Sequence, residues 1–260
     1  MKKLLYYSLF ALSVLAISSC GSKNVYEPKA FSVSETKQVY FSPGNLQYHC
    51  KNKEWRFAPL QYDCIGKDNV NISPEYDGYI DLFGWATSDN PTFASEESKD
   101  YINVPFTEWG TKINDGNVWQ TLTYDEWQYI IEGRENASDK YAVAEVAEVQ
   151  GLILLPDDWE SPDGLSFRRG VYEDENGQIF YGKKNKYSAT DWQKMESSGA
   201  VFLPAAGLRY GTHIQDVRST GDYWTSSTGG YTFGFNSCYI YACHLSLSYG
   251  AYSVRLVRAL

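Results

Sequence analysis

Gly221-Asp-Tyr-Trp-Thr-Ser-Ser227 opens the last forty residues of the chain, and Ser253-Val-Arg-Leu-Val-Arg-Ala-Leu260 closes them. In the closing run, Val254, Leu256 and Val257 are interspersed with arginines, a pattern that predicts a buried or half-buried strand. A chain that ends on an apolar strand has its terminus held in a sheet. We therefore expect the fold to be organised around this C-terminal segment.

The residues between these two ends, 236–252, have an unusual composition. They include four tyrosines but no Lys, Arg, Asp, Glu, Gln, Met, Trp or Pro. Tyrosine supplies rigid contact area at a low entropic cost, and small polar residues adapt their hydrogen bonds, so this composition suits a binding surface. Our candidate ligand-binding residues are Tyr239, Tyr241, His244, Ser246, Ser248 and Tyr252.

A regular strand in this run would divide its side chains between two faces. Tyr239, Tyr241 and Cys243 would share one face, and Cys238, Ile240 and Ala242 would share the other. The pattern does not decide which of these faces is buried.

The first residues indicate where the protein is located. Lys2 and Lys3 precede an apolar stretch, 4–17, that is too short to span a bilayer as a mature helix. The following Ile17-Ser18-Ser19-Cys20 resembles the lipobox of bacterial lipoproteins. This resemblance implies a signal peptide over 1–19 and acylation of Cys20, which would anchor the chain in the cell envelope, at the periplasmic or surface face of the outer membrane. An ordinary signal peptide with a chance cysteine is the alternative.

Charge and length limit the partners and the domain count. Loss of Lys2 and Lys3 with the signal peptide lowers the 23 basic residues to 21, against 32 acidic residues. Phosphate backbones repel such an acidic chain, so we expect no nucleic-acid partner. The polar residues 20–37 are typical of a flexible tether, and 38–260 is long enough for one domain, which we expect to be monomeric.

Four cysteines follow Cys20, and outside the cytoplasm they can pair in three ways. They are Cys50, Cys64, Cys238 and Cys243. We prefer a disulfide between Cys50 and Cys64. The three histidines have no metal-ligand spacing, so we expect neither a metal nor another cofactor.

Local patterns place several elements. Alternation predicts strands over 38–41, 46–48, 55–57 and 201–203. Capping boxes that begin at Thr123 and at Ser188 predict two helices, which end near Gly133 and Gly199. Residues 141–150 fit either a helix or a strand; we favour a hairpin with 152–155, because Gly151 would break a helix. Asp157 and Asp158 read as turn caps, with a carboxylate pair or a calcium ligand as the alternative.

Four segments occur in an order and spacing that resemble a known family. Leu122-Thr123 is followed by Glu126-Trp127, Tyr129 and Arg134; Phe202-Leu-Pro-Ala-Ala-Gly207 precedes Tyr223-Trp-Thr-Ser-Ser227; and the chain ends with Ser253-Val-Arg-Leu-Val-Arg258. Together they resemble formylglycine-generating-enzyme-like (sulfatase-modifying-factor-like) domains and related lipoproteins of gut anaerobes. The resemblance covers roughly residues 39–260. It implies an α+β, C-type-lectin-like fold with small twisted antiparallel sheets, two helices and long irregular loops.

The same family implies what the C-terminal segment does. Its last strands and loops form an exposed face, which diversity-generating retroelements vary in some of these lipoproteins. The residue types of 236–252 fit the alphabet that such variation produces. We therefore expect a non-catalytic, membrane-anchored lipoprotein that displays a C-terminal surface for a protein or glycan ligand. A structural subunit of a surface assembly is an alternative.

An enzymatic alternative rests on Cys238 and Cys243. Formylglycine-generating enzymes use a similarly spaced cysteine pair that binds copper, and soft thiolates select Cu(I). The arginine-rich surroundings and the Gly-Phe-Arg-Cys ending of those enzymes are missing here. Two cysteines five residues apart on a regular strand also point to opposite faces. A copper-dependent oxidase is therefore the lesser alternative, and we expect no enzymatic activity.

Overall fold

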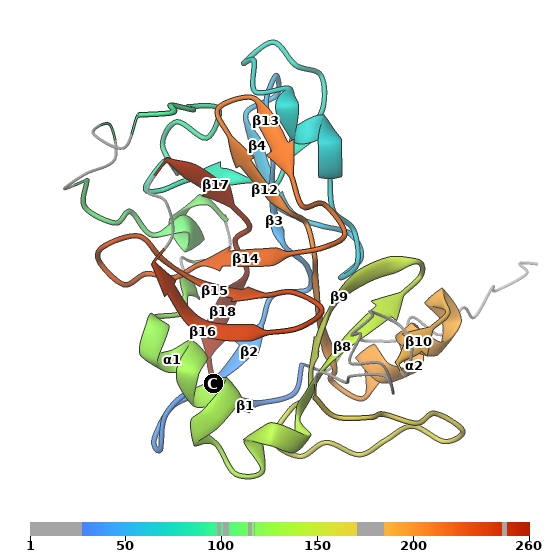
Figure 1. The fold of residues 1–260 in the computed structure, drawn as a ribbon. Helices are drawn as coiled ribbons and strands as arrows, with labels where there is room; N and C mark the ends of the chain where they lie inside the picture. The colour runs from blue at the N-terminus through green and yellow to red at the C-terminus, as the bar shows by residue number, and fades with distance from the viewer. Residues whose placement is uncertain are drawn as a thin grey trace, which may run out of the picture.

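The computed structural model describes residues 28–97, 100, 104–113, 116, 118–170, 185–245 and 249–260, with the backbone alone at 242–245. Over these residues the chain is α+β: two α-helices accompany five small sheets, and every strand pair is antiparallel except β10 with β8 (Figure 1). This confirms the expected α+β class with small antiparallel sheets.

The strands form the five sheets in the following spatial orders. They are β1 (Phe31–Ser32), β2 (Gln38–Phe41), β18 (Leu256–Ala259) and β7 (Trp119–Thr121); β10 (Lys186–Tyr187), β8 (Tyr141–Val146), β9 (Val149–Leu154) and β11 (Val201–Pro204); β13 (His213–Gln215), β12 (Leu208–Tyr210), β17 (Gly250–Tyr252) and β6 (Phe83–Gly84); β14 (Gly221–Trp224), β15 (Tyr231–Phe235) and β16 (Ile240–Leu245); and β4 (Glu54–Phe57), β3 (Leu46–His49) and β5 (Tyr79–Ile80).

The helical segments are few and short. They are α1 (Tyr124–Gln128), α2 (Ala189–Ser197), the π-helical turn η4 (Tyr129–Gly133) and the 3-10 turns η1 (Gly66–Val70), η3 (Trp109–Lys112) and η5 (Ala137–Asp139).

The terminal strand β18 lies inside its sheet, between β2 and β7, as its apolar pattern predicts. Val257 pairs with Phe41 and Leu256 pairs with Thr121, and both Leu256 and Val257 are fully buried. Burial of a valine or leucine side chain contributes about 1.5–3 kcal/mol. The strand therefore holds the end of the chain in the core.

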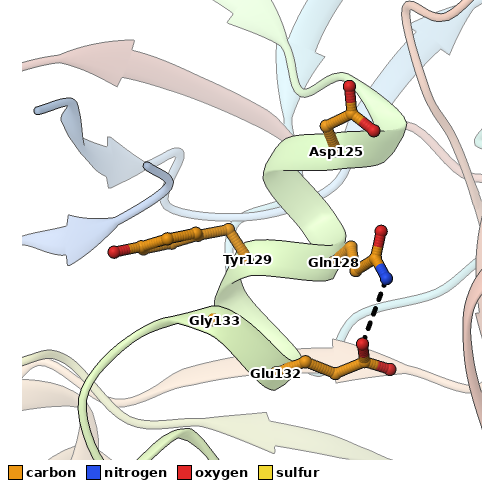
Figure 2. A pocket seen from close by; sticks show the side chains of 5 residues that line it. All are labelled: Asp125, Gln128, Tyr129, Glu132 and Gly133. Atoms are coloured by element: carbon orange, nitrogen blue, oxygen red, sulfur yellow. Dashed lines mark hydrogen bonds between the residues drawn. The ribbon is translucent and has the colours of Figure 1, made fainter. Parts of the chain in front are cut away.

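Helix α1 begins at the predicted capping box. The Thr123 hydroxyl accepts a hydrogen bond from the Glu126 N–H at 3.2 Å, and the Glu126 carboxylate accepts one from the Thr123 N–H at 2.8 Å. Trp127 then stacks on Phe233 of β15, with 4.3 Å between the ring centroids. The helix continues directly into η4, as Figure 2 shows from close by. This packing fixes one face of β15 and β16 against the core.

The second helix and the hairpin are also confirmed. In α2, the Ser188 hydroxyl accepts from the Asp191 N–H at 3.1 Å, the buried Trp192 and Met195 face the core, and the chain turns out of the helix at Gly199, where φ is +95°. Strands β8 and β9 pair up to the turn at Ala147 and Glu148, whose φ values are 47° and 68°. Positive φ at both turn residues is the geometry of a two-residue hairpin loop, which decides between hairpin and helix.

The folded part begins before the boundary expected at residue 38. Phe31 and Val33 are each 1% exposed, and Phe31 pairs with Val39 across β1 and β2. Phe31 and Val33 are therefore core residues, although both fall within the tether expected over 20–37. The polar composition around Phe31 hid a strand of only two residues.

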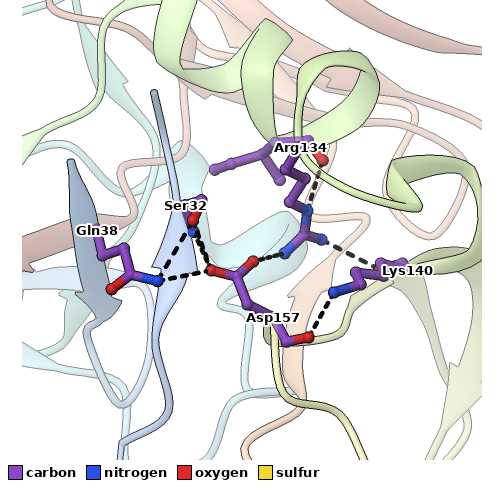
Figure 3. A network of polar contacts seen from close by, with 6 residues as sticks. Ser32, Gln38, Arg134, Lys140 and Asp157 are labelled. Atoms are coloured by element: carbon purple, nitrogen blue, oxygen red, sulfur yellow. Dashed lines mark hydrogen bonds and ion pairs between the residues drawn. The ribbon is translucent and has the colours of Figure 1, made fainter. Parts of the chain in front are cut away.

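The carboxylate of Asp157 holds β1 in place (Figure 3). It accepts hydrogen bonds from the N–H and the hydroxyl of Ser32, both at 2.7 Å, and it pairs with the buried Arg134 at 3.3 Å. Burial acts to raise the pKa of Asp157, but these hydrogen bonds and the charge of Arg134 outweigh it and lower that pKa. Asp157 is therefore a half-buried anchor with several partners, as well as the turn residue that its position in the sequence indicated.

Candidate functional site

The hairpin between β15 and β16 is closed by a single asparagine. The Asn236 side-chain oxygen accepts hydrogen bonds from the Cys238 N–H at 2.7 Å and from the Tyr239 N–H at 2.8 Å. The Asn236 N–H donates to the Tyr239 carbonyl at 2.9 Å. An asparagine that bonds the backbone two and three residues ahead stabilises a tight turn. The tip of the hairpin is thereby fixed relative to the sheet.

Two tyrosines of the candidate set stand on the outer side of this hairpin. Tyr239 is 62% exposed and Tyr241 is 37% exposed, and their rings stack with centroids 6.0 Å apart. Ile240 between them packs against the core cluster that contains Phe233 and Phe235. The structure therefore decides the question left open by the sequence: Tyr239 and Tyr241 face outward.

The strand does not alternate regularly beyond Tyr241. Gly234 pairs with Tyr241, whereas Thr232, two residues earlier, pairs with His244, three residues later. Strand β16 therefore has one extra residue at this point, a β-bulge, which bends a strand and interrupts its alternation. The face expected to run from Tyr239 to Cys243 is regular only as far as Tyr241.

The structure describes the other four candidates to different extents. Tyr252 is 3% exposed and packs edge-on against Trp224 at 4.8 Å, so it is a core residue, and its assignment to the binding surface is corrected. The backbone of His244 lies in β16. Ser246 and Ser248 lie outside the described residues.

A residue that the sequence analysis missed lies beside the tyrosines. Asp222 of β14 pairs with Gly234, which pairs in turn with Tyr241, so the three residues form a row across the sheet and share one face. Asp222 is 9% exposed. Burial, with a smaller contribution from the charge of Asp216, raises the pKa of its carboxyl to about 7. An acid set between Gly221 and Tyr223 was the only signal, and it is a weak one.

A shallow hollow of about 250 Å³ lies on α1 and η4 (Figure 2). Asp125, Gln128, Tyr129, Glu132 and Gly133 line it, and the Gln128 amide donates to the Glu132 carboxylate at 3.1 Å. All of these residues come from one continuous helical segment.

The expected disulfide between Cys50 and Cys64 is absent. Both cysteines are free, as is the exposed Cys238. Burial, together with the charge of Asp81, raises the pKa of the Cys64 thiol to about 12, so this thiol is protonated at neutral pH. Neither Cys50 nor Cys64 is therefore placed as a reactive thiolate.

The described residues were compared with two kinds of feature, a metal-ligand cluster and a membrane-spanning helix, and contain neither. Among them, no group of three or more His, Cys, Asp or Glu residues is arranged to hold a metal ion. In the same part of the chain, no helix combines the length and the apolar character needed to cross a bilayer.

No known family model, curated protein or solved structure matches the chain. The family resemblance carried by the four sequence segments therefore stays a hypothesis.

Proposed function

We propose that this protein is a non-catalytic, lipid-anchored binding protein of the bacterial envelope, whose ligand contacts the outer face of the β15–β16 hairpin. The observation that carries the proposal is the pair of stacked, exposed tyrosines, Tyr239 and Tyr241. Exposed stacked aromatics on a fixed backbone lose little entropy when they bind, and they are typical of binding surfaces. A protein or a glycan is the expected ligand.

The frame behind the tyrosines supports this proposal. Trp127 stacks on the opposite face of β15, and Asn236 closes the hairpin tip with three hydrogen bonds. A rigid backbone lowers the entropic cost of binding. We further propose that the fold is C-type-lectin-like and that Cys20 carries the lipid, both on the strength of the sequence resemblance.

We propose in addition that 236–252 is a diversified segment. Its uncharged, tyrosine-rich composition and the outward position of Tyr239 and Tyr241 support this. Sequencing the gene in closely related genomes tests it. The proposal predicts substitutions concentrated at outward positions of this run, whereas a substitution rate equal to that of the rest of the domain would contradict it.

A binding screen tests the main proposal. We expect the full-length protein in detergent micelles to retain specific ligands on glycan and protein arrays, and the double variant Tyr239→Ser with Tyr241→Ser to lose them. The double variant Leu60→Ser with Val70→Ser is the matched control, because these side chains are 40% and 43% exposed elsewhere on the surface. Equal loss in both double variants, or retention of every ligand without the two tyrosines, would refute the proposal.

A further inference from the structure

Asp222 differs from the buried Asp81 and from the half-buried Asp157. The Asp81 carboxylate accepts hydrogen bonds from the N–H of Ile65 and from the Asn69 amide, and Asp157 pairs with Arg134. The carboxylate of Asp222, 9% exposed, accepts no hydrogen bond from any described residue. Buried carboxylates normally have donors, because burial without them is costly. The described residues therefore leave the oxygens of this carboxylate available to a donor.

The Asp222 carboxylate lies directly over Gly234. A Cβ atom at position 234 would lie 2.6 Å from Asp222 Oδ1, so a side chain there would displace the carboxylate. Because Gly234 has no side chain, the carboxylate reaches over β15 toward Tyr241, the next residue of the same row. Strands lie about 4.8 Å apart, so the acid and the tyrosine are roughly two strand spacings from each other.

The same face is closed on one side and open on the other. Trp224, two residues from Asp222, is buried against Trp85, with ring centroids 5.1 Å apart. Tyr241, at the outer strand, is 37% exposed. Asp222 therefore lies between the buried part of this face and its exposed part.

We propose that Asp222, with the ring faces of Tyr241 and Tyr239, forms a subsite for one cationic side chain of a protein ligand, a lysine ammonium or an arginine guanidinium. This inference rests on the proposed function. Aromatic faces attract such cations, and a desolvated carboxylate binds them through charge-assisted hydrogen bonds. Residues 236–252 supply no Lys or Arg of their own to pair with this carboxylate. The acidic balance of the chain also favours the approach of a cationic partner.

Saturation-transfer NMR on the full-length protein in detergent micelles tests the subsite. The probes are Nα-acetyl-arginine methylamide and its neutral isostere Nα-acetyl-citrulline methylamide, at about 0.15 M salt. We expect the arginine probe to bind roughly tenfold more tightly than the citrulline probe, and Asp222→Asn to remove this preference. Asp163→Asn is the matched control, because it removes the same charge at an exposed site.

Each outcome bears on the inference. Loss of the preference in Asp222→Asn alone supports the subsite. Its loss in Gly234→Ala, which retains the charge but displaces the carboxylate, supports the position of the carboxylate over Gly234. Equal weakening in Asp222→Asn and Asp163→Asn would assign binding to net charge and overturn the inference. Absence of any preference for arginine in the wild-type protein would also overturn it. If array ligands depend on Tyr239 and Tyr241 but are unaffected by Asp222→Asn, the inference fails and the proposed function stands.

Discussion

Substitution of Asp222 by asparagine is expected to remove a loss of stability that the wild-type protein suffers as the pH rises. Burial raises the pKa of the Asp222 carboxyl from an ordinary 3.8 to about 7 in the folded protein. When folding raises the pKa of an acid, the folded state binds the proton more tightly than the unfolded state. The free energy of unfolding is therefore highest below the unfolded pKa, and it falls as the pH rises through the folded pKa. Folding of the wild-type protein is therefore penalised increasingly between about pH 4 and about pH 7.

The size of the effect follows from the same two pKa values. At 1.36 kcal/mol for each pH unit, the difference between 3.8 and about 7 corresponds to about 4 kcal/mol, which is an upper value because the structure relaxes around a buried charge. Asparagine has nearly the same shape and does not ionise. We expect Asp222→Asn to gain stability relative to the wild-type protein as the pH rises, by roughly 2–4 kcal/mol at about pH 8.

Urea unfolding followed by tryptophan fluorescence measures this difference. The free energy of unfolding of each protein is determined from about pH 4 to about pH 8, and the difference between variant and wild type is plotted against pH. Asp81, whose pKa is also raised, to about 6, is present in both proteins and cancels in the difference. Asp163→Asn, at an exposed site, is expected to give a flat line. A flat line for Asp222→Asn as well would refute the reasoning.

Three further substitutions test the packing of helix α1 and of strand β1 against the core. Trp127→Ala removes the ring stacked on Phe233 and is expected to lower the free energy of unfolding by about 3–5 kcal/mol, measured by urea denaturation; a loss under about 1 kcal/mol would contradict the packing. Thr123→Ala removes the cap of α1 and is expected to cost about 1 kcal/mol in the same assay, and a neutral result would argue against the cap. Phe31→Ala is expected to lower the free energy of unfolding by about 3–5 kcal/mol, because Phe31 is buried. A change within about 0.5 kcal/mol would show that Phe31 belongs to the flexible tether and not to the core.

The sequence predicted the elements that depend mainly on residues close together in the chain. The capping box at Thr123 depends on residues three apart, and the apolar pattern of Leu256 and Val257 indicates burial wherever the strand lies. A hairpin of 141–150 with 152–155 was favoured because Gly151 excludes a long helix; the structure has a hairpin here, but its turn lies earlier, at Ala147 and Glu148. Each of these predictions is confirmed, because few distant residues are needed to decide it.

The features that the sequence did not predict depend on distant contacts. Phe31 forms a strand because Asp157, far along the chain, holds Ser32. Tyr252 looked like a surface tyrosine by composition, and it is buried only because Trp224 lies beside it. The β-bulge in β16 follows from the pairing register.

The environment of Asp222 depends on distant residues too. Its buried position follows from the register with Gly234, and a lone acid in an apolar stretch does not reveal that register.

Hydroxyl-radical footprinting of the tyrosines, with and without an array ligand, tests the central claim most directly. In the free protein, the account predicts rapid oxidation of Tyr239 and Tyr241 and slow oxidation of the buried Tyr223 and Tyr252. When the ligand is bound, it predicts protection of Tyr239 and Tyr241 alone. Slow oxidation of Tyr239 in the free protein, or unchanged oxidation of both exposed tyrosines in the complex, would contradict the claim that this hairpin is the binding surface.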